Sequence, residues 1–428
     1  HPCHRPRLLP HQSSRTPIPH LPPARLAHRL QHHREHRQTT RQASQGDRKV
    51  LEPPRCRANP PGRCSPRFHR RLLGPLLGCP PPHLSTVGDY THPPWMGVFA
   101  ATLCAFREDE SLDEAGLRAY IRELAAVPGL KGLVPNGHTG EIMSLREKER
   151  ADVTRIVAEE VESSGKRLKV ISGVCGEGSL SAIDQAIAAK KAGADAILLM
   201  PPHHWLRFGR SSAEAVGFIA DVAEGADIDI VIHQYPAWTK AGCTLKEMIE
   251  MVKIPRVKCI KMGTRDMARW LWDHEQLRAA RPDLSIITCH DEYLLPTLLE
   301  AGDGALIGFA GFAPKLMIEL VHACLEGDLP RAKKAQQTVA PLARLIYNFG
   351  EPGCAAHQRM KVAKWLMGQF PSPVFRRPVR PLPQAEVQRL REGLQALGMK
   401  AVNQGKGDWL QTIAVGNHRR KSRKEKQT

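Results

Sequence analysis

The sequence predicts an α/β fold, a (β/α)8 TIM barrel followed by a C-terminal helical appendage. Between residues 92 and 328, strand-like and helix-like patterns form eight strand–helix units over about 230 residues, close to the roughly 250 typical of such a barrel. The loop after the first expected strand, Thr102–Phe106, lacks the glycines with which a doubly wound open sheet binds nucleotides. Polar side chains also follow several expected strands, at the end where a barrel places its site.

The eight expected strands are short apolar runs bounded by glycine, proline or polar turn residues. They cover residues 97–103, 130–134, 168–173, 196–200, 228–233, 257–263, 284–288 and 304–309. The helices between them have helical apolar periodicity, and the first begins at a capping box made by Ser111 and Glu114. These helices cover residues 111–127, 145–163, 180–192, 212–223, 245–252, 267–280, 292–301 and 314–325.

The positive charge of the chain lies at its two ends. Of a formal net charge of +19, residues 1–91 contribute 16 Lys/Arg against 4 Asp/Glu, and residues 400–428 contribute 8 against 2. Residues 92–399 keep 38 basic and 37 acidic residues, so the expected folded part is nearly neutral. No basic face that would bind nucleic acid is therefore predicted. RNA binding through the two ends is an alternative, and such binding would weaken steeply with rising salt concentration.

Four segments are predicted: a disordered basic segment rich in proline and histidine (1–91), a barrel (92–328), a helical extension (329–399) and a basic flexible tail (400–428). The first segment has no sustained apolar periodicity from which to build a core. It has neither an initiating Met nor an apolar signal core, which favours a doubtful gene model. A transit-like leader is the alternative, although the prolines of this segment oppose an amphipathic helix.

Composition also predicts the compartment. No apolar run approaches the roughly 20 residues needed to cross a bilayer, so no membrane partner is expected. The 11 cysteines are scattered and form no CxxC pair, which favours free thiols in a reducing compartment over disulfides or structural zinc. We predict a cytoplasmic protein, and an organellar leader is not supported.

One expected strand, residues 257–263, carries a lysine near its C-terminal end. Lys261 would lose much of its hydration there, which lowers the pKa of its amine and frees it to attack a carbonyl as a Schiff-base nucleophile. The alternative is a lysine whose stem lies along apolar surface while its amine reaches water or a carboxylate. The residues at the other strand ends bear on this choice.

Four histidines fall at the ends of other strands: His138 after the second, His203 and His204 after the fourth, and His233 at the end of the fifth. Imidazole can move protons near neutral pH, so these rings predict a proton relay at the barrel mouth. Each ring could instead make an ordinary hydrogen bond, or three rings could bind Zn²⁺. We expect no metal, because no carboxylate–histidine spacing supports one and Lys261 would have to stay neutral beside the cation. Schiff-base chemistry at Lys261 would require no organic cofactor either.

Three acidic residues also follow expected strands: Glu141, Asp291 and Glu292. A carboxylate at the start of a helix is stabilised by the helix dipole. We therefore expect all three to be helix-start residues rather than catalytic acids or metal ligands.

Over residues 92–399 the chain resembles the dihydrodipicolinate synthase/N-acetylneuraminate lyase (DapA-like) family of class I aldolases. Three motifs carry the resemblance: Gly137-His138-Thr139-Gly140-Glu141, His233-Gln234-Tyr235-Pro236, and Ile260-Lys261. They follow or end the second, fifth and sixth strands, and the 28-residue step from His233 to Lys261 matches the family's step from tyrosine to lysine. Residues 1–91 and the basic tail have no counterpart.

The resemblance implies a Schiff-base-forming lyase, an aldolase or dehydratase, acting on pyruvate or another 2-keto acid together with an aldehyde or a sugar acid. Lys261 would condense with the keto group, and the iminium would stabilise a carbanion. Gly137 and Thr139 would hold the keto-acid carboxylate with hydroxyl and backbone N–H groups. The other substrate-binding residues would be His204, Tyr235 and Trp238. The family also implies a homo-oligomer, often a tetramer.

The sequence departs from the family where protons are moved. His233 stands at the place of the family's tyrosine, two residues before Tyr235, and His203-His204 replace a tyrosine pair. Trp238 replaces an arginine that many synthases use for a second carboxylate. We predict that His138 and His233 act beside the lysine as catalytic residues, which leaves dihydrodipicolinate synthesis itself open. The alternatives are a non-catalytic ligand-binding barrel and a metal-dependent variant that uses the histidine cluster.

Overall fold

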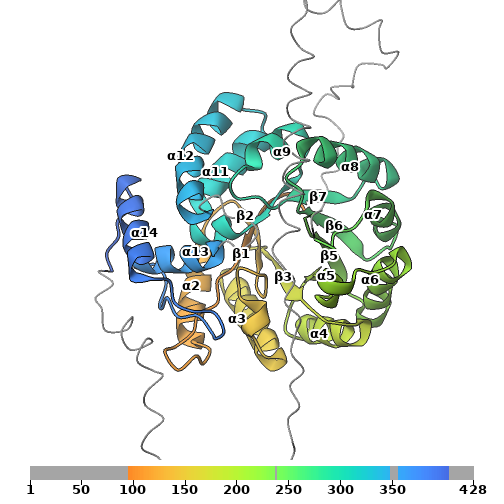
Figure 1. Ribbon diagram of the computed structural model, residues 1–428, viewed down its shortest axis with the longest axis horizontal. Helices are drawn as coiled ribbons and strands as arrows, with labels where there is room; N and C mark the ends of the chain where they lie inside the picture. The colour runs from red at the N-terminus through yellow and green to blue at the C-terminus, as the bar shows by residue number, and fades with distance from the viewer. Residues whose placement is uncertain (1–94, 237–238, 348–354, 404–428) are drawn as a thin grey trace, which may run out of the picture. The chain divides into compact units, whose positions relative to one another are not determined.

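The computed structural model describes residues 95–236, 239–347 and 355–403, and it has the predicted barrel (Figure 1). Eight parallel strands pair in chain order, and β1 pairs with both β2 and β8 to close the barrel. The strands are β1 (Gly97–Ala101), β2 (Leu130–Val134), β3 (Lys169–Val174), β4 (Ala196–Leu199), β5 (Asp229–Gln234), β6 (Val257–Met262), β7 (Ser285–Thr288) and β8 (Gly304–Ile307).

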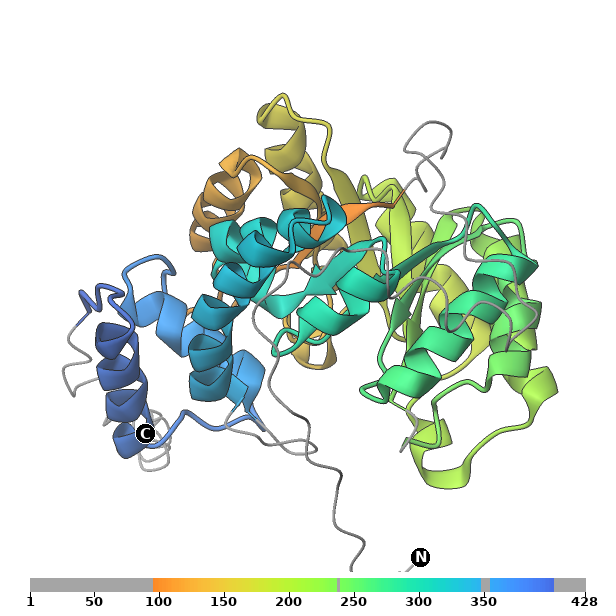
Figure 2. The ribbon, with the colours of Figure 1, turned by 90° about the horizontal axis from the view of Figure 1, so that it is seen from above.

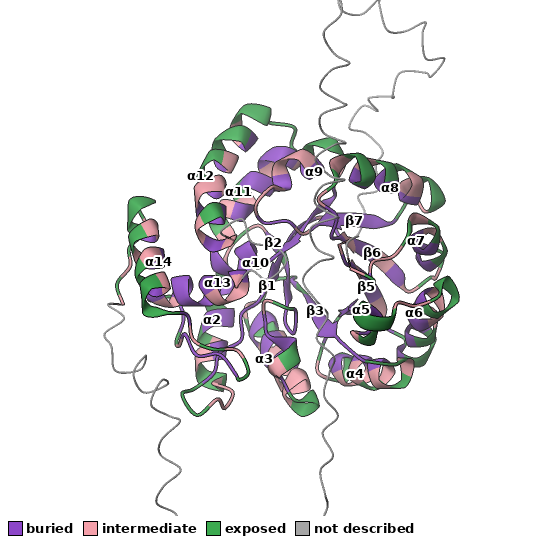
Figure 3. Cartoon of the chain, in the orientation of Figure 1, coloured by how far each residue is buried: buried purple, intermediate pink, exposed green. Residues whose placement is uncertain are grey.

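Helices surround the strands, and their inner faces are buried while their outer faces are exposed (Figure 3). Those of the barrel are α2 (Glu114–Ala126), η2 (Ile142–Ser144), α3 (Glu147–Ser163), α4 (Ser179–Lys191), α5 (His204–Phe208), α6 (Ser212–Ala226), α7 (Leu245–Val252), α8 (Met267–Ala280), α9 (Leu294–Glu300), α10 (Gly308–Phe312) and α11 (Pro314–Leu325). The C-terminal appendage contains α12 (Leu329–Tyr347), α13 (Ala356–Leu366) and α14 (Gln384–Ala396), which lie together beside α2 and α11 (Figures 1 and 2).

The start of α2 differs from the prediction. The N-cap is Asp113, whose carboxylate accepts a hydrogen bond from the Gly116 N–H, whereas Ser111 bonds to Asp109. The predicted capping box at Ser111 is therefore wrong, because an aspartate closer to the helix caps at least as well as a serine. The single-turn helices η2, α5 and α10 were not predicted either, since each is too short to show a periodic apolar pattern.

The interior of the barrel is filled by side chains that alternate along the strands. They include Val231 on β5, Cys259 on β6 and Ile287 on β7, all at most 1% exposed. Because successive side chains of a strand point to opposite faces, His233 and Lys261 also point inward, two residues closer to the C-terminal mouth. The strand register places these two residues opposite each other.

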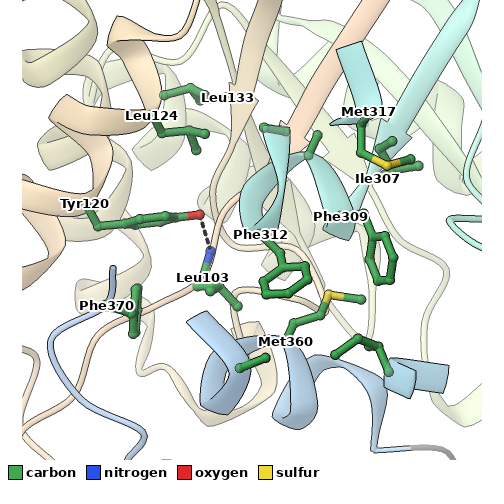
Figure 4. Packing of buried hydrophobic residues seen from close by; sticks show 14 of the residues in the cluster. Leu103, Tyr120, Leu124, Leu133, Ile307, Phe309, Phe312, Met317, Met360 and Phe370 are labelled. Carbon is green, nitrogen blue, oxygen red and sulfur yellow. Dashed lines mark hydrogen bonds between the residues drawn. The ribbon is translucent and has the colours of Figure 1, made fainter. Parts of the chain in front are cut away.

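The appendage shares a hydrophobic core with the barrel rather than forming a separate one. Tyr120 of α2, Phe312 of α10 and Met360 of α13 belong to the same buried cluster (Figure 4). The Tyr120 hydroxyl accepts a hydrogen bond from the Leu103 N–H at 3.3 Å and donates one to the Gly311 carbonyl at 2.9 Å. This packing brings α13 close to the C-terminal ends of the strands.

Within the described ranges, none of the helices is both long enough and apolar enough to span a bilayer.

Candidate active site

A cavity of about 460 Å³ opens at the C-terminal ends of the strands. Its wall combines strand-end residues with residues of the appendage, Tyr347 from α12 and His357 from α13. The polar residues that line it are His138, Thr139, His233, Tyr235, Thr239, Lys261, Cys289, His290, Asp291, Tyr347 and His357. Five of these residues were predicted from the sequence as site residues: His138, Thr139, His233, Tyr235 and Lys261. The others were not.

Lys261 lines this cavity from the inward face of β6. Burial lowers the pKa of its amine, although Cys289 and Asp291, as anions, act in the opposite direction. The backbones approach closely just beyond it, since a Cβ on Gly263 would lie 2.3 Å from the Gln234 carbonyl oxygen. A side chain at residue 263 would push β5 and β6 apart, so glycine keeps the lysine opposite His233.

His233 is a neutral imidazole at neutral pH. Burial, followed by the positive charge of the nearby Lys261, holds its pKa well below the ordinary value. Its Nδ1 atom is buried and has no hydrogen-bond partner among the described residues. Its ring centre lies 5.4 Å from that of His138 and 4.9 Å from that of Tyr235. The imidazole itself lines the cavity, next to Lys261 in the strand register.

Tyr235 and His138 are joined by a hydrogen bond between Oη and Nε2, 2.8 Å long. Burial raises the pKa of the Tyr235 phenol, which therefore keeps its proton. Burial lowers the pKa of His138 to about 3, and the Lys261 cation adds to this effect. His138 is exposed and lines the cavity. A protonated phenol facing a neutral imidazole makes the tyrosine the donor in this bond.

The segment after β2 forms a tight turn that carries Thr139 into the cavity wall. The turn is closed by a hydrogen bond from the Gly140 N–H to the Gly137 carbonyl at 3.1 Å. Glu141 ends it with a φ of 58° and precedes η2, but its side chain makes no cap bond there. It forms instead a buried ion pair with Lys361 of α13. Glu141 thus lies at the start of a short helix, as predicted, but its carboxylate pairs with Lys361 instead of capping that helix.

Asp291 also has a different position from the one predicted. The helix after β7 begins only at Leu294, and Asp291 is 2% exposed in the cavity wall. Its carboxylate accepts hydrogen bonds from the Phe309 N–H at 2.9 Å and from the Tyr347 hydroxyl. Burial raises the pKa of Asp291 to about 7, despite these two donors. The prediction of a helix-start residue is wrong, because the chain turns inward before the helix begins.

Its neighbour Glu292 likewise precedes α9 and forms an ion pair with Arg265. The helix-start prediction for Glu292 is therefore wrong as well.

Other predicted residues lie elsewhere. His203 and His204 place their Nδ1 atoms 3.0 and 3.2 Å from the two carboxylate oxygens of Glu177, and neither histidine is among the residues that line the cavity. Gly137 shapes the turn without lining the cavity. Trp238 lies outside the described residues. Within the described ranges, no group of three or more His, Cys, Asp or Glu residues could hold a metal ion.

Sequence reasoning missed several cavity residues, among them His290, Tyr347, His357 and Met360. His290 follows β7 and could have been found by the same strand-end argument that singled out the other histidines. The remaining three belong to the appendage, and nothing in the sequence pattern relates these helices to the barrel mouth.

A closed parallel barrel with a lysine in a cavity at its strand ends defines a class of α/β-barrel proteins whose site lies at that mouth. The model of the dihydrodipicolinate synthetase family matches residues 94–397. The chain belongs to this family, whose members are lyases of the class I aldolase type.

Individual relatives agree with this assignment. An uncharacterized DapA-like lyase of Rhizobium meliloti is 29% identical over 310 residues, which cover 72% of this chain and 98% of that protein. A 4-hydroxy-tetrahydrodipicolinate synthase of Methanothrix thermoacetophila is 30% identical over 298 residues, covering 70% of this chain and 95% of that protein.

Solved structures share the fold. YagE, a prophage protein of the dihydrodipicolinic acid synthase family from E. coli K12, has been solved in complex with pyruvate. It aligns with a TM-score of 0.64 and 26% identity, covering 71% of this chain and 99% of that one. Dihydrodipicolinate synthase from Aquifex aeolicus aligns with a TM-score of 0.65 at 22% identity, covering 72% and 100%. The predicted fold class and family are thus confirmed.

Proposed function

We propose that this protein is a Schiff-base-forming lyase, an aldolase or dehydratase, that acts on pyruvate or another 2-keto acid. The observation that carries the proposal is Lys261, a buried amine of lowered pKa in a cavity at the strand ends. A lowered pKa increases the neutral fraction of the amine, which is the form that attacks a carbonyl. The pyruvate complex of YagE supports a keto acid as the class of substrate.

In the proposed reaction, the Lys261 amine adds to the keto carbon, and the resulting carbinolamine loses water to give an iminium. The positive nitrogen then accepts the electron pair left when the bond from the adjacent carbon to its outer substituent breaks, and in the aldolase direction the hydroxyl of the departing fragment gives up its proton. The enamine takes up a proton on that adjacent carbon, and water hydrolyses the resulting iminium to free the keto acid and Lys261. His233 lines the cavity and faces Lys261 in the strand register, so we assign to it the transfer of these protons.

The low pKa of His233 does not oppose this role. A bound keto acid brings a carboxylate, and a negative charge beside an imidazole raises the pKa of that ring. The same charge acts on His138, which holds the Tyr235 hydroxyl at 2.8 Å. We assign to Thr139 and the adjacent backbone N–H groups the binding of the carboxylate, because Thr139 lines the same cavity.

Borohydride trapping tests the proposal. Incubation with pyruvate and sodium borohydride should attach the reduced keto acid to Lys261, as shown by peptide mass mapping. Lys261→Met should give no adduct. Lys258→Met is the matched control, because Lys258 lies on the same strand but on its opposite face, and it should be labelled like the wild type. No adduct with any of a panel of 2-keto acids would instead favour a non-catalytic binding barrel.

Two further assignments belong to this proposal. We propose that the protein assembles as a homo-oligomer, since its family often forms tetramers, and that it works in the cytoplasm. Sedimentation velocity of the full chain tests the first, and a monomer at micromolar concentration would contradict it.

A further inference from the structure

A second and larger cavity, of about 700 Å³, lies between α2, the start of α11 and the end of α13. It shares no lining residue with the cavity at the barrel mouth. Most of its wall is apolar and comes from these three elements and from the segment after α14. The apolar residues that the argument uses are Leu124, Val127, Phe312, Leu316 and Met367.

One cation stands within this apolar wall. Lys364 of α13 is only 6% exposed, although lysine is rarely buried without a partner. Its Nζ atom donates a hydrogen bond to the Phe312 carbonyl at 3.1 Å and lies 5.5 Å from the centre of the Tyr120 ring. An ammonium group has three donors, so this carbonyl uses only one of them.

No carboxylate of the described residues forms an ion pair with Lys364. Burial lowers the pKa of Lys364 to about 8. The negative charge of Glu123 acts in the opposite direction, but its effect is smaller. Two other lysines, Lys315 and Lys400, line the same cavity and are exposed. The cavity therefore has one buried lysine, Lys364, in its wall. Among the exposed charged residues that line it, two are basic (Lys315 and Lys400) and one is acidic (Glu123).

We propose that this cavity is a second binding site, which takes a monocarboxylate with an aliphatic body, held by its carboxylate on Lys364. A carboxylate would supply the missing counter-charge and accept the remaining N–H donors of the lysine. The aliphatic body would cover Val127, Leu316 and Met367, which are only partly buried and which an ion without such a body would leave in contact with water. The volume lies in the range of about 300–1,000 Å³ that small-molecule sites occupy.

The proposal does not depend on the chemistry at Lys261. Both cavities contact α13, but through different residues: His357 and Met360 line the mouth, whereas Lys364 and Met367 line the second cavity. A failure of borohydride trapping would leave the second site standing, and the absence of ligand binding here would leave the lyase standing.

Sodium octanoate is the probe for the test, and isothermal titration calorimetry of the full chain is the measurement. Octanoate should bind in a saturable manner. Octan-1-ol, which has the body without the charge, and acetate, which has the charge without the body, should each bind at least 10-fold more weakly. Lys364→Met keeps most of the side-chain volume and should weaken octanoate binding at least 10-fold, while pyruvate trapping on Lys261 stays unchanged.

Two more variants keep the test decisive. Val127→Trp should weaken octanoate binding by filling the cavity from the end of α2 without touching the cation. Lys333→Met, at an exposed residue of α12, should bind octanoate like the wild type. Absence of saturable binding to the full chain would overturn the proposal. So would binding that Lys364→Met and Val127→Trp leave unchanged.

Discussion

The buried ion pair between Lys361 and Glu141 tests how the appendage supports the candidate active site. Lys361 on α13 is 0% exposed, and Glu141, at the end of the turn that carries Thr139, is 5% exposed. The Nζ atom of Lys361 also donates to the Val374 carbonyl at 2.9 Å. It lies 4.3 Å from the centre of the Phe375 ring. The lysine therefore has several partners, whereas the carboxylate depends mainly on the lysine.

Lys361→Met should remove the cation and leave a carboxylate buried without its partner, which costs about 3–5 kcal/mol of unfolding free energy. The Oε2 atom of Glu141 has no hydrogen-bond partner among the described residues even in the native protein. Glu141→Gln should cost less, because Lys361 keeps the carbonyl and the aromatic rings. The double variant should be more stable than Lys361→Met alone, since a neutral amide costs less to bury than an unpaired carboxylate.

The pH dependence has a definite sign. Burial raises the pKa of Glu141 above its ordinary value, and Lys361 opposes that rise. Without Lys361 the folded-state pKa rises further. A carboxyl group with a raised folded-state pKa contributes stability when protonated, and this contribution is lost as the pH rises through that pKa. The stability deficit of Lys361→Met should therefore be smaller at pH 5 than at pH 8.

Urea unfolding followed by circular dichroism measures these differences, with Lys333→Met as a control that should unfold like the wild type. The reasoning fails if Lys361→Met lies within about 1 kcal/mol of the wild type at pH 8, because a broken buried pair costs more than that. It also fails if the deficit is the same at both pH values. A small deficit at pH 8 would mean that water reaches Glu141 in the variant. A deficit independent of pH would mean that the Glu141 carboxyl is not the group that destabilises the variant.

Two further predictions concern His233 and Asp291, which both line the cavity at the barrel mouth. His233→Phe should lower turnover of a keto-acid substrate by about 10²–10⁴-fold, the usual share of a general acid–base, while some adduct still forms slowly on Lys261. His233→Tyr should recover part of this loss. Tyr235→Phe should have the smaller effect, through His138, and a total loss in Tyr235→Phe with normal turnover in His233→Phe would reverse the assignment. Because the pKa of Asp291 is about 7, Asp291→Asn should remove a titration near neutral pH from the rate of adduct formation, measured between pH 5 and 9. A titration that persists in Asp291→Asn would belong to another group.

The sequence alone predicted the barrel and the face on which its site lies. Strand and helix periods are local properties of the chain, and eight repeats of the same unit leave few arrangements open. The inward direction of Lys261 and His233 also follows from alternation along a strand, and parallel strand ends necessarily meet at one mouth. The family resemblance rested on the same strand-end residues.

Contacts between segments distant in the sequence required the tertiary structure. The hydrogen bond from Tyr235 to His138 joins residues 97 positions apart, and the pairing of Lys361 with Glu141 joins residues 220 positions apart. Asp291 looks like a helix-start residue from its neighbours alone, but its pKa depends on how deeply it is buried, and Tyr347 reaches it from α12. Local pattern determines which elements form and which way they face. Burial, and with it the charge state of each group, depends on what the rest of the chain packs against that face.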